Sequence, residues 1–351
     1  MGTLYDIAII GLGPAGATLA RCLNKSLKVI AIDLKLDENS GFSKPCGGLL
    51  APDGQKALAR FNLTLPKRVL VDPQIFSVKT IDLDSGLIRY YQRFYVNLSR
   101  HKFDLWLKSL IGNNVDVYNN SRCSSVKKCD CGYEITFLNN GISQTVTAKY
   151  LVGADGANSI VRKTFFPKRK IRSYVAIQQW FEEKNSQPFY SCVFDSKNTD
   201  CYSWSISKDG YFIYGGAFPA KNSRERFEDQ KRKLEKLDFH FGEPIKTEAC
   251  MVFRPSSPFD FCCGRNGIFL IGEAAGYISP SSLEGISSAI NNGYILSKAL
   301  GNKNPNRSYF KRTLKIRLKL YLKLLKCPFM YFPPFRWLVM KSKLDSIDIC
   351  E

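Results

Sequence analysis

The hydrophobic positions at the start of the chain form two short runs with a stretch of helical character between them. Residues 5–10 are an apolar run of strand length, and residues 17–23 can form a helix. Residues 28–32 are a second apolar run, which ends at Asp33. This order of strand, helix and strand predicts a βαβ unit with parallel strands.

Further along the chain, apolar and polar residues alternate, as they do in strands with one buried face. We predict an antiparallel meander over residues 115–150, with a turn at residues 139–141. Strand-like segments on both sides of this meander predict a second sheet, and residues 225–236 predict an exposed helix. The segments are residues 68–71, 75–83, 88–95, 174–181, 189–195, 202–207, 211–218 and 246–253.

Two later apolar runs lead into loops where a carboxylate follows a glycine. Asp155 lies in Gly-Ala-Asp-Gly, and Glu273 lies between Gly272 and Gly276. Ligands of α/β sheets bind at the carboxyl ends of parallel strands, so both carboxylates are candidate ligand contacts. For Asp155 taken alone, capping of the helix that follows is an alternative explanation.

The turn after the first strand reads Gly11, Leu12, Gly13, Pro14, Ala15, Gly16. Gly11 permits a tight turn, Gly13 lets the backbone approach a pyrophosphate, and Gly16 lets the helix pack closely on the strand. Free N–H groups at the start of the helix face the phosphates. Asp33 can accept hydrogen bonds from a ribose hydroxyl. The alternative is a glycine-rich turn in an ordinary α/β sheet.

One extended ligand that touches all three segments is FAD. Its ribose would meet Asp33, its pyrophosphate would meet residues 11–16, and its ribityl and flavin end would reach residues 273–286. Glu273 would hold ribityl hydroxyls. Backbone N–H groups of Gly285 and Ile286 would stabilise negative charge on a ring carbonyl. We therefore predict FAD as the cofactor.

A loop with the sequence Pro-Cys-Gly-Gly is a candidate neighbour of the reactive ring. Its proline stiffens the turn, and Gly47 and Gly48 let the backbone come close to a flat group, with Cys46 facing the substrate. A structural turn with an incidental thiol is the alternative. Arg100 follows Ser99, a candidate helix N-cap, and a cation there is poorly placed for the helix dipole. We expect Arg100 to pair with a phosphate or carboxylate.

These patterns predict an α/β fold in which two units are interleaved in sequence. A Rossmann-like FAD-binding domain is expected from residues 1–65, 97–170 and 262–300. A mainly antiparallel β-sheet domain, which would hold the substrate, is expected from residues 66–96 and 171–261. Residues 301–351 are expected to form a basic tail of C-terminal helices.

The formal net charge is +20, and residues 301–351 carry +9 of it, with twelve Lys or Arg and three acids. Residues 314–320 alternate like a strand, but Phe310, Leu314, Leu318, Tyr321 and Leu325 also share one helical face. We favour the helix, because no turn residue interrupts residues 308–326. A basic amphipathic segment followed by aromatic residues favours a peripheral membrane contact. Docking on the chain's own domain is an equal alternative.

The cysteines and histidines give no metal signature. The twelve cysteines are irregularly spaced and the chain has two histidines, so one Cys-x-Cys at residues 129–131 makes no zinc site. The first residues run directly into a predicted core strand, so we expect no secretory leader, reduced thiols and a cytoplasmic protein, with the inner face of the membrane as a further location. No uncharged apolar run reaches the roughly 18 residues that span a bilayer. No nucleic-acid-binding motif appears, and no nucleic-acid partner is expected.

Taken together, the motifs resemble the flavoprotein monooxygenase superfamily with the p-hydroxybenzoate-hydroxylase-like fold, and within it the geranylgeranyl reductase branch. The chain is similar to CbrA-type proteins of that branch over essentially its whole length. The motifs that carry the resemblance are Gly-Leu-Gly-Pro-Ala-Gly at 11–16, Ser-Lys-Pro-Cys-Gly-Gly-Leu-Leu at 43–50, Arg-x-x-Phe-Asp at 100–104, Gly-Ala-Asp-Gly-Ala-Asn-Ser at 153–159, Tyr-x-Trp-x-x-x-Lys at 202–208 and Gly-Glu-Ala-Ala-Gly at 272–276.

The resemblance implies roles for several residues. It implies FAD contacts from Arg100, from Asp155 and from residues 272–286, and it places Cys46, Gly47 and Gly48 beside the flavin. It also implies that Tyr202 and Trp204 line a cavity for a polyprenyl chain. Two departures are present: Glu273 stands where the superfamily has Asp, and Ile206 and Ser207 stand where the branch has Phe-Pro. The second departure puts an isoprenoid substrate in doubt.

The function that the resemblance implies is that of an FAD-dependent oxidoreductase acting on C=C bonds of a lipid-like substrate, with an isoprenoid as one candidate. Reduced flavin would pass a hydride to the alkene, and Cys46 is a candidate proton donor. Electrons would come from NAD(P)H or from a ferredoxin-like donor protein, because no second glycine-rich βαβ unit is present. An FAD-dependent monooxygenase and a non-catalytic membrane-associated flavoprotein are the alternatives.

Overall fold

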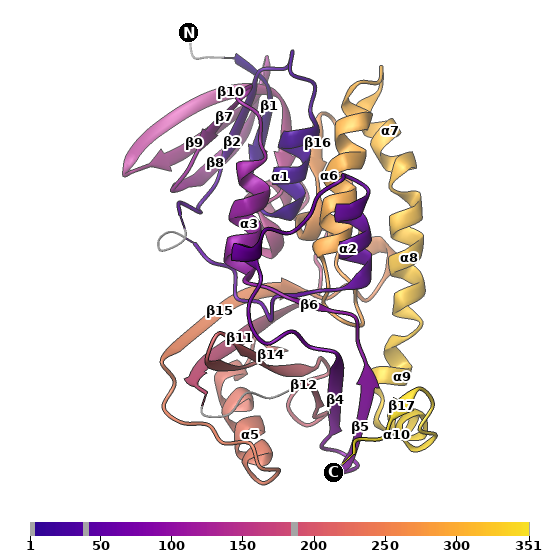
Figure 1. Ribbon diagram of the computed structural model, residues 1–351. Coiled ribbons are helices and arrows are strands. Elements are labelled where there is room, and N and C mark those ends of the chain that lie inside the picture. Colours follow the sequence, from indigo (N-terminus) through magenta and orange to yellow (C-terminus); the bar gives the residue numbers. More distant parts are fainter. Residues whose placement is uncertain (1–3, 38–41, 184–188, 351) are drawn as a thin grey trace.

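A computed structural model describes residues 4–37, 42–183 and 189–350. Two large sheets lie one above the other, and most of the helices lie on one side of them (Figure 1). Strands that are distant in sequence alternate between the two sheets, which is the interleaved α/β architecture that the sequence predicts. The outermost predicted unit boundaries, residues 1 and 351, lie outside the described residues.

The first sheet has seven strands in the order β7-β2-β1-β10-β9-β8, with β16 paired to β10. Strands β7, β2, β1 and β16 run parallel to the carboxyl half of β10, whereas β8, β9 and the first half of β10 form an antiparallel meander. The prediction of a meander from residue 115 was wrong for residues 115–118, which form β7 and pair parallel with β2 at the opposite edge of the sheet. The inner strands β1, β2 and β16 are almost wholly buried, as strands covered on both faces must be, whereas the edge strand β7 buries only Val115. The bounds are β1 Leu4–Ile10, β2 Val29–Ile32, β7 Val115–Tyr118, β8 Ser121–Cys129, β9 Gly132–Asn139, β10 Ile142–Gly153 and β16 Ile268–Leu270.

Helices α1, α3 and α6 pack around the parallel half of this sheet, with α2 beside α6 (Figure 1). Helix α6 crosses α1 closely because Gly293 has no side chain: a Cβ there would lie 2.3 Å from the carbonyl oxygen of Ala15. This contact fixes the start of α1 against α6, the helix that follows the segment with Glu273. The bounds are α1 Pro14–Cys22, α2 Pro52–Ala59, α3 Arg100–Ser109, α4 Ile160–Phe165 and α6 Ile286–Leu300.

The second sheet has eight strands in the order β15-β11-β14-β13-β12-β4-β5-β17. All neighbouring pairs are antiparallel except β12 with β4, so the sheet is mainly antiparallel, as predicted. Helix α5 packs an apolar face, including Phe227 and Leu234, against β11 and β14. The bounds are β4 Ser77–Asp82, β5 Leu87–Gln92, β11 Ser173–Glu182, β12 Phe189–Phe194, β13 Ser203–Lys208, β14 Tyr211–Pro219, α5 Ser223–Glu235 and β15 Lys246–Phe253.

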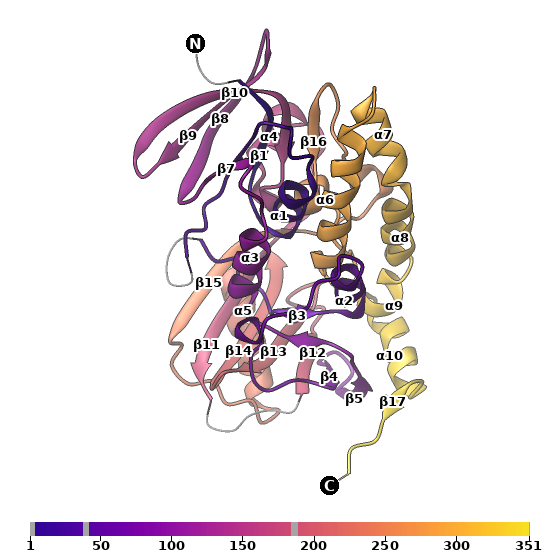
Figure 2. The same ribbon diagram turned by 45° about the horizontal axis from the view of Figure 1, so that its top comes forward.

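A small two-stranded sheet, β3 (Leu49–Leu50) with β6 (Val96–Asn97), joins the segments that cross from one large sheet to the other. It lies between the two large sheets in Figure 2. Strand β3 directly follows the Pro-Cys-Gly-Gly loop, so this pairing fixes the loop at the junction of the sheets.

The tail is mostly helical and runs along the outer side of both sheets (Figure 2). Residues 314–320 are helical, which decides the helix-or-strand question that their alternation raised. The tail is not entirely helical, because β17 adds a short strand to the edge of the second sheet. In the described part of the chain, no helix is long and apolar enough to cross a bilayer. The bounds are α7 Pro305–Arg312, α8 Leu314–Leu324, α9 Cys327–Tyr331, α10 Pro333–Lys341 and β17 Ser346–Ile347.

Candidate functional site

The first glycine turn combines tight packing with one open position. Gly11 has a φ of +93°, and a Cβ there would lie 2.7 Å from the carbonyl oxygen of Ala154. A Cβ on Gly16 would lie 2.0 Å from the carbonyl oxygen of Gly11, so α1 can start here only because position 16 is glycine. Gly13, the N-cap of α1, has no atom within 4 Å of the place where its Cβ would be. The turn therefore leaves space beside the uncapped start of a helix, where Pro14 and Ala15 begin its first turn.

Asp33 lies beside this turn at the end of β2. Its Oδ1 accepts a hydrogen bond from the backbone N–H of Leu12 at 3.1 Å. Two lysines compensate its charge: Lys108 Nζ lies 3.2 Å from Oδ2, and Lys35 Nζ lies 3.6 Å from Oδ1. The carboxylate is buried and held in place next to the first glycine turn, where the sequence predicted a ribose contact.

Asp155 has one engaged oxygen and one free oxygen. Its Oδ2 accepts from the backbone N–H of Ile160 at 2.8 Å, which is the capping interaction considered for it. Its Oδ1 is buried, and no described group donates a hydrogen bond to it. Burial raises the pKa of this carboxyl to about 6. A buried acceptor without a donor is rare in a native protein and indicates that a ligand or water supplies the donor.

Glu273 connects the loops after β10 and β16 to the rest of the site. Its Oε1 accepts from the backbone N–H of Phe253 at 3.0 Å, and its Oε2 forms an ion pair with Lys44. A Cβ on Gly156 would lie 3.9 Å from Oε2, so the loops after β10 and β16 touch. The ion pair with Lys44, in the loop that contains Cys46, extends this contact toward the second sheet. Glu273 thus contacts protein donors, in addition to any ribityl hydroxyl that it was predicted to hold.

The segment that begins with Gly272 and Glu273 continues to the start of α6. The φ values of Gly272 and Gly276 are +59° and +83°, and the N–H of Gly272 donates to Oδ1 of Asn292 in α6 at 2.9 Å. Gly285 is the N-cap of α6 and offers no side-chain cap of its own. Unlike the start of α1, the first turn of α6 has a carboxylate beside it, because Oε1 of Glu284 accepts a hydrogen bond from the backbone N–H of Ser287 at 2.9 Å. The backbone N–H groups of Gly285 and Ile286 belong to this helix start, which packs against α1.

The Pro-Cys-Gly-Gly loop and the start of α3 lie together. Ser99 caps α3 by accepting from the backbone N–H of Lys102, as predicted. Arg100 donates from Nε to Asp104 at 2.7 Å, and its Nη1 lies 3.8 Å from Sγ of Cys46. The backbone N–H of Gly48 also donates to this sulfur, at 3.4 Å. Arg100 therefore pairs with a carboxylate of its own helix and with the Cys46 thiol.

The aromatic strand β13 lies against this loop. A Cβ on Gly47 would be 3.4 Å from the Trp204 ring, so the indole packs on the bare glycine. Tyr202 lies next to it, with ring centroids 6.1 Å apart, and its hydroxyl donates to the carbonyl oxygen of Ser282 at 2.7 Å. Nε1 of Trp204 is buried without a hydrogen-bond partner in the described ranges. The structure thus brings the predicted cofactor loop and the predicted substrate strand into contact.

Lys208, at the end of the same strand, is a site residue that the sequence analysis did not select. It is 5% exposed, and its Nζ donates to Asn97 Oδ1 at 2.5 Å and to the carbonyl oxygen of Leu98 at 2.7 Å. The carbonyl oxygen of Gly48 lies 3.5 Å away. Burial lowers the pKa of this ammonium to about 7. The sequence signal that could have identified Lys208 is its position as the last residue of the Tyr-x-Trp-x-x-x-Lys motif.

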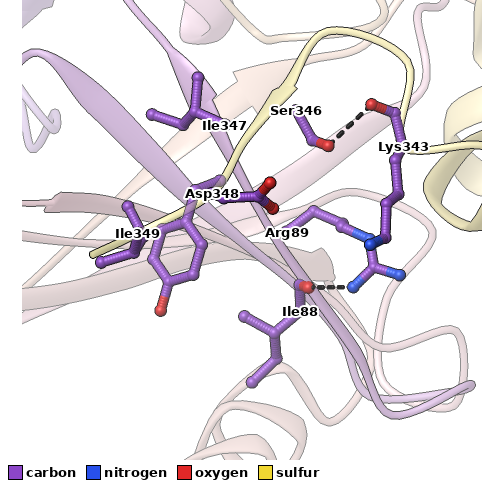
Figure 3. Close-up of a pocket in the computed structure, with 8 residues that line it drawn as sticks. Ile88, Arg89, Lys343, Ser346, Ile347, Asp348 and Ile349 are labelled. Carbon is purple, nitrogen blue, oxygen red and sulfur yellow. Dashed lines mark hydrogen bonds between the residues drawn. The ribbon is translucent and has the colours of Figure 1, made fainter. Parts of the chain in front are cut away.

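A hollow of about 420 Å³ elsewhere in the molecule does not belong to this site (Figure 3). It lies where β17 joins β5, and residues such as Arg89 and Lys343 line it. None of the predicted site residues borders it. Among the described residues, no group of three or more His, Cys, Asp or Glu is placed to hold a metal ion. All twelve cysteines lie in the described ranges, and each is a free thiol.

The residues at the first turn, at Asp155 and at the start of α6 fit a bound dinucleotide. The open space at Gly13 beside the uncapped start of α1 and the buried acceptor without a donor at Asp155 lie at the carboxyl ends of neighbouring parallel strands. Strand ends of this kind are where doubly wound sheets bind dinucleotides. The fold and the site together define an FAD-binding oxidoreductase.

Comparison with known proteins identifies the family. Residues 111–304 match the FAD binding domain family. The protein CbrA of Escherichia coli O139:H28 is 53% identical over 347 residues, which cover 98% of each chain. The chain belongs to the CbrA family of FAD-binding proteins.

Solved structures show the same fold at low sequence identity. A geranylgeranyl bacteriochlorophyll reductase-like protein from Thermoplasma acidophilum is 22% identical, with a TM-score of 0.69 over 98% of this chain and 88% of that one. A probable FAD-dependent monooxygenase from Pseudomonas aeruginosa is 17% identical, with a TM-score of 0.61 over 98% of this chain and 97% of that one. The fold is therefore shared by flavoproteins with different reactions.

Proposed function

We propose that this protein is an FAD-dependent reductase that saturates a C=C bond of a lipid-like substrate, with an isoprenoid as one candidate. The observation that carries the proposal is the packing of Trp204 on Gly47. This contact brings the loop that contains Cys46 and an aromatic strand to one place. The fold shared with the reductase-like protein from Thermoplasma acidophilum is further support.

The aromatic residues around Trp204 suit an apolar chain. The Tyr202 and Trp204 rings are neighbours, and Tyr95 packs edge-on against Tyr190, with centroids 6.2 Å apart. Burial raises the pKa of Tyr190 and of Tyr202 well above the usual value, so both phenols stay neutral in the physiological range. Neutral rings with few free polar atoms bind apolar chains and exclude water.

When bound, reduced FAD supplies a hydride for one carbon of the double bond. The second carbon needs a proton, and the Cys46 thiol is the proposed donor. Once the thiol has lost its proton, Arg100 and the N–H of Gly48 stabilise the charge left on sulfur. The substrate gains two hydrogens in total, and the thiolate takes up a proton from solvent before the next turnover.

The test uses FAD-loaded protein, reduced with dithionite in the absence of oxygen and then mixed with polyprenyl alcohols of increasing length. We expect reoxidation of the flavin and a product heavier by two hydrogen atoms. Cys46→Ala is expected to lower the rate by about 10²–10⁴-fold, the usual contribution of a general acid. Cys131→Ala, which removes an exposed thiol in the turn before β9, is the matched control and is expected to react like the wild type.

Other outcomes would favour the alternative functions. Oxygen uptake coupled to a product with an added oxygen atom would replace the reductase with a monooxygenase. Stoichiometric FAD without turnover for any substrate or donor would indicate a non-catalytic flavoprotein. Turnover of Cys46→Ala at the wild-type rate would refute the role of Cys46 while leaving the reductase activity standing. Mass spectrometry of lipids that co-purify with the yellow protein would identify the substrate.

We further propose that electrons come from NAD(P)H bound transiently near the flavin, or from a ferredoxin-like protein. The basis is the single glycine-rich βαβ unit of the chain. Stopped-flow measurement of flavin reduction by each donor distinguishes the two. Either donor is compatible with a cytoplasmic location, which the reduced thiols also favour.

A further inference from the structure

One face of the helices α7 and α8 packs against the rest of the protein. Tyr309, Thr313 and Leu320 point into the molecule and are 0%, 0% and 2% exposed. The Tyr309 hydroxyl donates to the carbonyl oxygen of Leu270 at 2.8 Å, which anchors α7 to β16. The two helices are therefore docked on the first sheet and on α6 without any contribution from their opposite face.

The opposite face is apolar and exposed. Phe310, Leu314, Leu318 and Leu325 are 54%, 60%, 54% and 56% exposed, and Tyr321 is 39% exposed. Their spacing of three or four residues places them in one stripe along the outer side of α7 and α8, which form the outer edge of the molecule in Figure 1. We call these five residues the outer stripe. It is the helical face that the sequence predicts, but it faces away from the protein.

The apolar surface continues beyond α8. In α9, α10 and the residue between them, four large apolar side chains are between 41% and 57% exposed: Phe329, Phe332, Phe335 and Leu338. Soluble monomers rarely leave so many large apolar side chains exposed on neighbouring elements. A surface of this kind needs a partner.

The charged side chains that α7 and α8 carry are of one sign. From residue 285 to residue 344 the chain contains no Asp or Glu. Lys311, Lys315, Lys323 and Lys326 lie on α7, on α8 or directly after α8, and Arg317 stacks on the Phe310 ring at 4.0 Å. Lysines and arginines carry long apolar stems, so they can cover an apolar surface while their charged ends reach outward.

Exposed apolar side chains together with surrounding cations fit one kind of binding partner. A second copy of the chain would bring the cations of α7 and α8 against the same cations, and these helices carry no carboxylate to compensate them, which costs free energy. A nucleic acid would meet the cations but leave the apolar stripe without contacts. An anionic bilayer satisfies both, because acyl chains receive the apolar residues while phosphates meet the cations. We propose that the outer stripe and the adjoining residues of α9 and α10 form a surface that lies in the interface of an anionic membrane.

The position of this surface is connected to the candidate site. The Tyr331 hydroxyl in α9 donates to the carbonyl oxygen of Ser281 at 2.7 Å, and the Tyr202 hydroxyl donates to that of Ser282 at 2.7 Å. One loop thus contacts both the tail and the aromatic strand. A lipid-like substrate would then have a short path from the membrane to β13, an extension that rests on the proposed function.

The experiment is vesicle flotation of the full, FAD-loaded chain. Vesicles of phosphatidylcholine are compared with vesicles of phosphatidylcholine mixed with phosphatidylglycerol. We expect the wild type to float with the anionic vesicles only, and less so at high salt. The double variant Leu314→Ser/Leu318→Ser is expected to lower the partition coefficient at least roughly tenfold, because two exposed leucines no longer enter the acyl region. Lys315→Gln/Lys326→Gln is expected to lower it by about tenfold or more.

The control is Ile142→Ser, which removes a side chain that is 67% exposed on β10 in the first sheet. It is expected to float like the wild type. Equal flotation by the wild type and the double leucine variant would overturn the proposal, as would equal binding to neutral vesicles. A concentration-dependent dimer that the leucine variant abolishes, without vesicle binding, would assign the surface to a second copy. Membrane binding does not require turnover, so this result is independent of the proposed activity.

Discussion

Asp155 illustrates how a single residue reflects the state of the whole site. Its backbone contact to Ile160 satisfies one carboxylate oxygen, and the other oxygen is buried without a donor. The folded protein holds the pKa at about 6, above its usual 3.8, because burial disfavours the charged form. The charge on Asp155 therefore destabilises the FAD-free protein at neutral pH.

Replacing Asp155 with asparagine tests this cost. The folded state binds more protons than the unfolded state between the two pKa values, so Asp155 lowers stability as pH rises through that interval. We expect Asp155→Asn to raise the free energy of unfolding of the FAD-free protein by about 1–2 kcal/mol at pH 7, with the gain vanishing toward pH 4. The same variant should bind FAD more weakly. Urea unfolding and FAD titration give the two readings.

The exposed Asp130 in the turn before β9 offers a matched control, since Asp130→Asn should change neither quantity. A stability gain for Asp155→Asn that does not depend on pH would show that ionisation of Asp155 is not its cause.

Adjacent glycines in the Pro-Cys-Gly-Gly loop are expected to respond differently to substitution. Gly48 has a φ of +63°, and a Cβ there would lie 2.3 Å from the carbonyl oxygen of Leu98 and 2.7 Å from Lys208 Nζ. We expect Gly48→Ala to destabilise the protein by about 2–4 kcal/mol, because both backbone strain and overpacking oppose it. A Cβ on Gly47 would only touch the Trp204 ring, so Gly47→Ala is expected to cost less than about 1 kcal/mol. Thermal unfolding of both variants checks the difference; similar losses would contradict it.

At the scale of elements, α1 shows which glycine serves the fold and which serves the ligand. Gly16 is fixed by the chain itself, because a Cβ would collide with Gly11. Gly13 faces open space and has a φ of −68°, which any residue can adopt. The motif in the sequence does not separate these two roles.

Alanine at each position provides the test. Gly16→Ala is expected to prevent stable folding or to cost about 3 kcal/mol or more, since the backbone must move. Gly13→Ala is expected to change the stability of the FAD-free protein by less than about 0.5 kcal/mol. Its FAD affinity should fall at least roughly tenfold, because the methyl group occupies space needed by the pyrophosphate. Unchanged affinity in Gly13→Ala would move the pyrophosphate away from this turn.

The helix α8 shows where a sequence pattern fixes an element but not its orientation. Its composition and the absence of turn residues predicted the helix correctly. The same pattern identified an apolar face, and ordinarily such a face packs on the protein. Here a second, less conspicuous face with Tyr309, Thr313 and Leu320 is buried instead. Only the position of α6 and β16 decides between the two faces.

At the scale of the whole molecule, the tail is tied to the second sheet by a buried ion pair. Arg336 in α10 donates to Asp82 at 2.7 Å and to Asp84 at 2.5 Å, and Asp82 is fully buried. No sequence motif predicts this contact, because Arg336 and its two partners are about 250 residues apart in the chain. It places α10 against β5 and gives the outer surface of the tail a fixed support.

Removing this arginine should be costly. Arg336→Met leaves Asp82 buried without its counter-ion, and we expect a loss of about 3–5 kcal/mol in the free energy of unfolding. Lys319→Met, which removes a half-exposed partner of Asp53, is expected to cost about 0–1 kcal/mol. Urea denaturation provides the comparison. Adding Asp82→Asn to Arg336→Met should recover part of the loss; no recovery would show that packing of Arg336, rather than its charge, matters.

Both sheets and their order along the chain were predictable from the sequence, because each depends on local patterns. The glycine turn after β1, the two later strand ends with glycine and carboxylate, the meander and the alternating segments each require only nearby residues. FAD was predictable for the same reason, since the three motifs fit one extended ligand.

The contacts between these parts depended on the tertiary structure. Lys208 is a site residue only because β13 ends beneath Gly48 and Leu98, and Glu273 pairs with Lys44 only because the two sheets meet there. The outward direction of the outer stripe was likewise decided by tertiary packing, because the face with Tyr309, Thr313 and Leu320 is the one that is buried. Periodicity and motifs are local, and for this reason they were enough to predict most of the elements and the cofactor class. The site between the sheets and the exposed surface of the tail were decided by long-range packing, which no local pattern encodes.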